Sequence, residues 1–164
     1  MITVEQVLHL SAVPHENAPR SGPTRGARYT DVYLSEANQL LGTYRALRRY
    51  RDDHYEFYGA NRSQKTWEAH HVLEDRSLDY LQIRSKFPDK EKGLCVLIPV
   101  AAHHRINSIF IEHTRQFSDV RHVLEGYRLA HSVLGNYSGA RPGAVALELD
   151  KLLRAAFRCA GLVA

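Results

Sequence analysis

The chain has 164 residues, of which 44% are apolar and 24% are charged, and this composition excludes an intrinsically disordered protein. One domain with a sizeable hydrophobic core is expected at this length. The net charge of +4, with ten histidines in addition, favours an anionic partner but is too small for a chromatin-type protein.

The sequence predicts a soluble protein. No apolar run reaches the roughly 18 residues that a membrane-spanning helix needs. Residues 1–13 lack a basic start and carry Glu5 in their apolar stretch, which argues against a cleavable secretory signal. We expect synthesis in the cytoplasm, and delivery into a target cell without such a signal stays open. Cys95 and Cys159 lie in apolar segments and predict buried thiols.

The first part of the chain predicts a short helix over residues 3–10 and an irregular arm rich in Pro, Gly and Arg over 14–29. A longer helix is expected from the capping residues Thr30 and Asp31 to about Asp52. Its apolar stripe recurs at three- and four-residue spacing: Tyr33, Leu34, Ala37, Leu40, Leu41, Tyr44 and Leu47.

The end of that helix is basic. It contains Arg45, Arg48, Arg49 and Arg51 around Tyr50. Arginine mixed with tyrosine suits phosphate contact and base stacking, although such a face can also be merely solvated. Arg48 and Arg49 are therefore candidate substrate-binding residues.

Two strands are expected in the middle of the chain. Residues 66–73 and 94–98 are apolar or β-branched runs that predict buried strands. A tyrosine-rich loop over 53–65 precedes the first strand. Between the two strands, residues 74–87 allow a short helix and residues 88–93 predict an exposed turn.

Pro99 ends the second strand and suits the first turn of a helix. Three helices are expected from there on, with Ser118 and Asp119 as capping residues of the second: 100–117, 120–134 and 144–159. The fold class is therefore α+β and mostly helical, with a small two-stranded insert embedded among amphipathic helices.

Two pairs of adjacent histidines lie at the edges of the two strands, His70-His71 and His103-His104. Phosphodiester hydrolysis needs an activated water and stabilisation of charge on the phosphate and the leaving oxygen. A histidine that is neutral near pH 7 can take the water's proton, and a divalent metal can stabilise the charge. A β-hairpin packed on a helix is a small scaffold that offers both.

His103 and Asn107 are four residues apart on the expected helix, so both can point at one ion. His104 is an alternative ligand, but its partner at the same spacing is Ser108, a poorer ligand, which favours His103. Imidazole, an amide oxygen and water suit one divalent ion such as Mg, Mn, Ni or Zn.

Two charged residues beside the histidines are further candidates. Glu68 shares the strand face of His70 and can join or orient the site, or be an ordinary surface residue. Arg105 adjoins the proposed ligands and can hold the scissile phosphate. The structural alternative for both histidine pairs is hydrogen-bonded or solvated side chains without a metal.

The run Ala69-His70-His71, the Leu-Ile-Pro strand end and the histidine-bearing helix resemble the HNH (His-Me finger, ββα-metal) nucleases. The resemblance is to the AHH branch among bacterial polymorphic toxins, and it covers about a quarter of the chain, residues 67–107. It implies that His71 is the general base, that His70 and His103 are metal ligands, and that Asn107 is the last ligand.

One position departs from that family. Before the second strand the family usually has an asparagine that orients the base through its carbonyl, whereas this chain has Lys92-Gly93. Either another carbonyl takes this role here, or the base is oriented less well.

The resemblance implies a single nuclease domain with a ββα-metal core over 66–117. The N-terminal helix and arm (1–29), the basic helix and loop (30–65) and a helical C-terminal part (118–164) surround this core. The implied activity is a metal-dependent endonuclease, with DNA expected ahead of RNA. The implied role is an antibacterial toxin or secretion-system effector, which can be a C-terminal module of a longer protein. The resemblance also implies a cognate immunity protein.

Two alternatives belong to other classes. One is a non-catalytic, helical nucleic-acid-binding module with a structural zinc, which would unfold when the metal is removed. The other is a metal-dependent hydrolase of a small ester with little affinity for polyanions.

Overall fold

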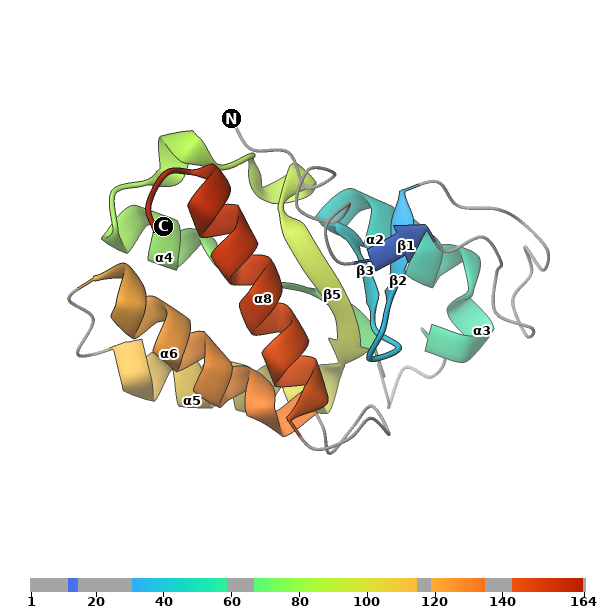
Figure 1. Cartoon of the computed structure of the whole chain (residues 1–164). Helices are drawn as coiled ribbons and strands as arrows, with labels where there is room; N and C mark the ends of the chain where they lie inside the picture. Colours follow the sequence, from blue (N-terminus) through green and yellow to red (C-terminus); the bar gives the residue numbers. More distant parts are fainter. Residues whose placement is uncertain (1–11, 15–30, 59–66, 115–118, 135–142, 164) are drawn as a thin grey trace.

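The computed structural model describes residues 12–14, 31–58, 67–114, 119–134 and 143–163 (Figure 1). The fold is α+β, and it contains a five-stranded antiparallel sheet with the order β1-β2-β3-β5-β4. The strands are β1 Ala12–Pro14, β2 Val32–Ser35, β3 Leu40–Thr43, β4 Trp67–His71 and β5 Leu94–Pro99. The expected two-stranded insert was therefore too small, because β4 and β5 are one end of a larger sheet.

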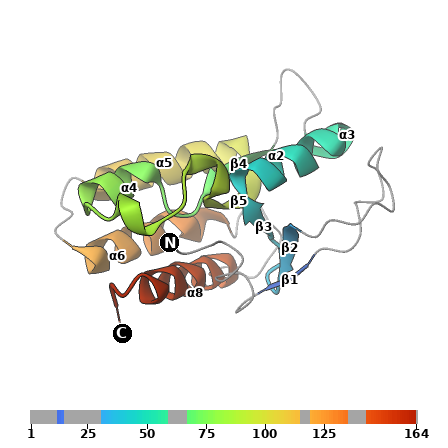
Figure 2. The same cartoon turned by 90° about the horizontal axis from the view of Figure 1, so that it is seen from above.

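Helices lie on both sides of β5. They are α2 Tyr44–Asp53, α3 Tyr55–Tyr58, α4 Asp75–Tyr80, α5 Val100–Thr114, α6 Val120–His131 and α8 Ala144–Cys159. Three 3₁₀ turns are η1 Arg84–Lys86, η2 Lys90–Lys92 and η3 Ser132–Leu134. Figures 1 and 2 show α4, α5, α6 and α8 on one side of β5, and α2 and α3 with β1–β3 on the other.

Strand β5 is buried on both faces, since successive side chains of a strand point to opposite sides. Val96 and Ile98 belong to a core shared with the long helices α5, α6 and α8. Cys95 and Leu97 belong to a second core with α2. This double burial explains why residues 94–98 are continuously apolar rather than alternating.

The helix expected to start at Thr30 and Asp31 is wrong in its first half, which forms the β2–β3 hairpin. Tyr33 pairs with Leu41, and the turn between the strands has Asn38 at a φ of 60°. Helix α2 begins only at Tyr44, where Thr43 Oγ1 accepts a hydrogen bond from the Ala46 amide at 3.1 Å. The apolar spacing had suggested one helix because a short hairpin followed by a helix places apolar residues at similar intervals.

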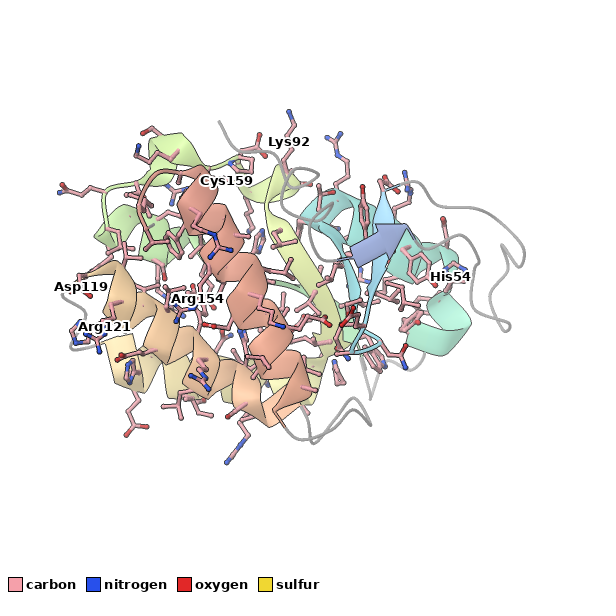
Figure 3. All side chains as sticks on the ribbon, viewed as in Figure 1. His54, Lys92, Asp119, Arg121, Arg154 and Cys159 are labelled. Atoms are coloured by element: carbon pink, nitrogen blue, oxygen red, sulfur yellow. The ribbon has the colours of Figure 1, made fainter. Side chains whose placement is uncertain are left out.

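Most of the later elements match the sequence prediction. Helix α5 follows Pro99 directly, and α8 has the expected bounds. Asp119 caps α6 by accepting a hydrogen bond from the His122 amide at 3.0 Å, at the end of the helix seen in Figure 3. The expected burial of both thiols holds for Cys95 but not for Cys159, which is exposed at the end of α8 (Figure 3).

Two segments that connect the expected elements contain short helices and turns of their own. The segment 53–65 contains α3, and 74–93 contains α4, η1 and η2. The helix expected over 3–10 lies outside the described residues, as does the expected arm over 14–29 apart from Pro14, which ends β1. Among the described helices, none combines the length and apolar character needed to cross a membrane.

Candidate active site

A cleft of about 430 Å³ lies at the edge strand β4 and is also lined by residues of α2 and α5. Five residues singled out from the sequence on β4 and α5 line it: Glu68, His70, His71, His103 and Asn107. The antiparallel pairing of β4 with β5 brings these residues together, because β5 ends at Pro99 and leads directly into α5.

The two histidines of β4 approach the cleft from opposite faces of the sheet. His70 faces α5 and α6, where its ring lies 4.8 Å from that of His103 and 5.4 Å from that of His131, measured between centroids. His71 faces α2 and stacks on Tyr44, with ring centroids 5.0 Å apart and an interplanar angle of 16°. Since β4 is the edge strand, both side chains reach the same opening.

The orientation of His71 is fixed by a main-chain group. Its Nε2–H donates a hydrogen bond to the carbonyl oxygen of Lys90, 2.8 Å away. In the neutral ring this leaves the lone pair on Nδ1, so Nδ1 is the atom that can accept a proton. Another carbonyl thus contacts the proposed base, two residues before the Lys92-Gly93 pair that stands where the family has asparagine.

The loop that carries this carbonyl is itself ordered by hydrogen bonds. Asp89 Oδ1 accepts from the amides of Glu91 at 3.0 Å and Lys92 at 3.2 Å, which closes the turn η2. The Tyr44 amide donates to the Gly93 carbonyl at 3.1 Å and ties the loop to the start of α2.

Gly93 lies against the ring of His71. A Cβ atom at this position would be 3.1 Å from His71 Cδ2 and 3.4 Å from Nε2. The absence of a side chain therefore lets the loop approach closely enough for the Lys90 carbonyl to reach the imidazole.

Glu68 orients His103. The Nδ1–H of His103 donates to the Glu68 carboxylate, and this bond holds the pKa of the carboxyl below its usual value despite partial burial. The other ring nitrogen, Nε2, is then the one available to a ligand. A carboxylate bonded to a histidine in this way is the usual support for a metal-binding imidazole.

His70 is buried, with only 1% of its surface exposed. Its Nε2 lies 3.1 Å from Nε2 of His131, and its Nδ1 has no hydrogen-bond partner. Burial, together with the neighbouring His131, His103 and His71, lowers the pKa of His70 well below the usual value. Burial also lowers the pKa of His131 to about 3. His70 is thus neutral at pH 7, the form that binds metals.

The remaining sequence candidates separate into two groups. Arg48 lines the cleft, and its guanidinium lies 5.4 Å from the centroid of the Tyr44 ring. Arg49 does not line the cleft and forms an ion pair with Asp31 at 2.5 Å. His104 and Arg105 are exposed on α5 and do not line the cleft either.

Sequence reasoning missed several residues of the cleft, namely Tyr44, Arg51, Glu74, Asp75, Arg76 and Lys90. The sequence does give a reason to consider Arg51, because it belongs to the basic cluster of Arg45, Arg48 and Arg49. Lys90 lies in a segment that predicted only an exposed turn, and its contribution to His71 comes from the backbone, so no side-chain pattern could indicate it. His131 has no partner at ligand spacing in the sequence, and only the tertiary fold places it beside His70.

The donor set fits a divalent cation in its chemistry. His70 offers a buried Nδ1 without a partner, His103 offers Nε2, and Asn107 lies one helical turn further on. Within the described ranges, no group of three or more His, Cys, Asp or Glu side chains has the arrangement of a metal site. The fit therefore rests on the two imidazoles with an amide oxygen and on the unpartnered His70 nitrogen.

Comparison with known proteins gives no relative: no protein-family model, no curated protein and no solved structure matches the chain. The chemistry of the cleft is therefore inferred from its own residues.

Proposed function

We propose that the protein is a metal-dependent endonuclease of HNH type that hydrolyses phosphodiester bonds, with DNA as the first expected substrate and RNA as the second. The observation that carries the proposal is the placement of His71. Its Nε2–H is held by the Lys90 carbonyl, while His70 and His103 line the same cleft.

In the proposed mechanism His71 is the general base. A water molecule in the cleft would give its proton to Nδ1 of His71, and the Lys90 carbonyl and the Tyr44 ring would hold the imidazole in place during the transfer. Glu68 would keep His103 in the tautomer with Nε2 free.

The proposed ligands of the divalent ion, Mg, Mn, Ni or Zn, are His70, His103 and Asn107. When bound, such an ion supplies Lewis-acid stabilisation of charge on the phosphate and the leaving oxygen. Arg48 would contact a phosphate at the mouth of the cleft, since it lines the cleft from α2.

The biological role that we propose is that of an antibacterial toxin or secretion-system effector with a cognate immunity protein. This part of the proposal is supported by the resemblance of residues 67–107 to the AHH branch of polymorphic toxin nucleases.

The proposal predicts that His71→Ala lowers supercoiled-plasmid nicking by about 10²- to 10⁴-fold, the usual contribution of a general base. Nicking would be measured with Mg, Mn, Ni or Zn and with EDTA, and metal binding should be retained in the variant. His104→Ala is the matched control, because His104 is exposed on α5 and does not line the cleft.

Cutting that survives His71→Ala would overturn the assignment of the base. Tight binding of DNA or RNA without cutting under any metal would instead support the non-catalytic binding module.

A further inference from the structure

A buried histidine pair joins the edge strand to helix α6. His70 on β4 and His131 at the end of α6 are separated by 61 positions in the sequence, yet their Nε2 atoms lie 3.1 Å apart. His131 is fully buried and His70 almost so. Buried polar groups are normally hydrogen-bonded, and here the Nδ1 atoms of both rings have no partner. Such a pair calls for an explanation.

The contact admits two arrangements of hydrogens, since one Nε2 must donate and the other accept. If His70 donates, its Nδ1 carries a lone pair. If His131 donates, Nδ1 of His70 carries a hydrogen and cannot bind a cation.

The surroundings of His70 favour the first arrangement. His70 lines the cleft, and its ring is 4.8 Å from that of His103, whose Nδ1–H is already directed to Glu68. A cation bound by His70 Nδ1 and His103 would satisfy a nitrogen that is otherwise buried without a partner.

The ring of His131 is packed in a fixed position beside His70. Its ring stacks on Tyr127, with centroids 5.5 Å apart and an interplanar angle of 22°. The Tyr127 hydroxyl accepts from the Glu74 amide at 2.8 Å and lies 2.9 Å from Ser77 Oγ. The helix α6 and the segment after β4 are thereby fastened together around the histidine pair.

We propose that His131 is a positioning residue, which accepts the Nε2–H of His70 and thereby presents the Nδ1 lone pair of His70 to a divalent cation in the cleft. This inference rests on the proposed function, because it assumes that His70 is a metal ligand. It adds a residue that lies outside the β4–β5–α5 unit and does not line the cleft.

The test compares His131→Leu, which removes the acceptor, with His131→Gln, whose side-chain oxygen can take the place of Nε2. Affinities for Zn²⁺ and Mn²⁺ would be measured by isothermal titration calorimetry on the full chain. His131→Leu should weaken binding by about 10- to 100-fold, as is usual when the partner of a metal-binding histidine is removed. His131→Gln should bind within a few-fold of the original protein.

Two measurements separate positioning from a purely structural role. Thermal unfolding in EDTA should change little in His131→Leu, because the substitution removes one unpartnered nitrogen and leaves another, Nε2 of His70. In long-range ¹H–¹⁵N spectra without metal, His70 should be the Nε2–H tautomer in the original protein and in His131→Gln. His122→Ala, which removes a half-buried histidine at the other end of the same helix, should behave like the original protein in all assays.

The outcomes distinguish this inference from the proposed function. Unchanged metal affinity in His131→Leu would overturn the role of His131 and leave the nuclease proposal intact. Equal loss in the Leu and Gln variants would also overturn it, since the imidazole itself would then be required. Metal binding with the expected pattern but without cutting would overturn the nuclease proposal alone, and no metal binding by the original protein would overturn both.

Discussion

At the scale of single residues, the candidate site depends on side chains whose ring nitrogens are assigned different tasks by their partners. Lys90 bonds Nε2 of His71, and Glu68 bonds Nδ1 of His103. These assignments leave Nδ1 of His71 and Nε2 of His103 for the chemistry. The proposed roles of base and ligand therefore depend on neighbours as much as on the histidines themselves.

Gly93→Ala tests how closely His71 must be held. The new methyl group would lie 3.1 Å from His71 Cδ2, so the ring or the loop must move. We expect nicking to fall by about 10-fold or more, because small displacements of a reacting group are costly. Plasmid nicking and thermal unfolding would be measured together, with Lys92→Ala as the neighbouring control. Unchanged nicking in Gly93→Ala would show that the contact with His71 does not matter for activity.

The sequence alone predicts that candidate residues close to one another along the chain lie near one another in the fold. His70 and His71 are adjacent, and His103 and Asn107 are one helical turn apart, so local spacing places each pair. Tyr44, Lys90 and His131 could not be found in this way, because their contacts with the histidines exist only after the sheet and the helices have packed.

At the scale of elements, strand β4 lies between helices on its two faces. The sequence predicts the later helices correctly but not the start of α2. Helices α5, α6 and α8 were predicted because each has a clear start and a continuous apolar stripe. The β2–β3 hairpin was mistaken for part of α2, since apolar spacing in strands of four residues does not discriminate between the two structures. The cap at Thr43 is the feature that separates them.

The contact between β4 and α6 predicts sensitivity to acid. Burial lowers the pKa values of His70 and His131 in the folded protein, so the unfolded chain takes up protons below about pH 6.5 while the folded chain does not. The stability is therefore fully present above pH 6.5 and is lost as the pH falls toward the folded-state pKa of about 3 for His131.

Urea unfolding in EDTA between pH 7 and 4 would measure this dependence. His131→Leu should reduce the slope of unfolding free energy against pH by up to about 1.4 kcal/mol per pH unit, the value for one proton. His122→Ala should keep the original slope. Equal slopes in the original protein and His131→Leu would contradict the burial of a neutral His131.

At the scale of the whole molecule, the cleft lies at the edge strand β4 and is lined from both α2 and α5, and its lining has mixed charge. The lining contains four basic residues, Arg48, Arg51, Arg76 and Lys90, and three acidic residues, Glu68, Glu74 and Asp75. Arg51 and Arg76 are paired with neighbouring carboxylates, at 3.0 Å and 2.6 Å respectively. The net charge of the chain therefore does not indicate where a polyanion would bind. The binding site depends on which basic residues of the cleft are not paired with a carboxylate.

Arg48 and Arg49 form a matched pair for testing this point. Arg48→Gln should weaken DNA binding and reduce the slope of log affinity against log salt by about 1, the value for one lost phosphate contact. Arg49→Gln should have a smaller effect, because Arg49 is outside the cleft and paired with Asp31. Binding would be measured by fluorescence anisotropy at several salt concentrations. Equal effects of the two substitutions would place the DNA outside the cleft.

The bond between His71 and the main chain of Lys90 has a consequence for how such sites vary among proteins. Every residue type has a backbone carbonyl, so position 90 can change its side chain without removing the group that orients the imidazole. What has to be preserved is the path of the loop, which depends on the turn closed by Asp89 and on the close approach at Gly93. A motif defined by residue identity alone does not capture a contact of this kind, because the group that holds the imidazole belongs to the backbone.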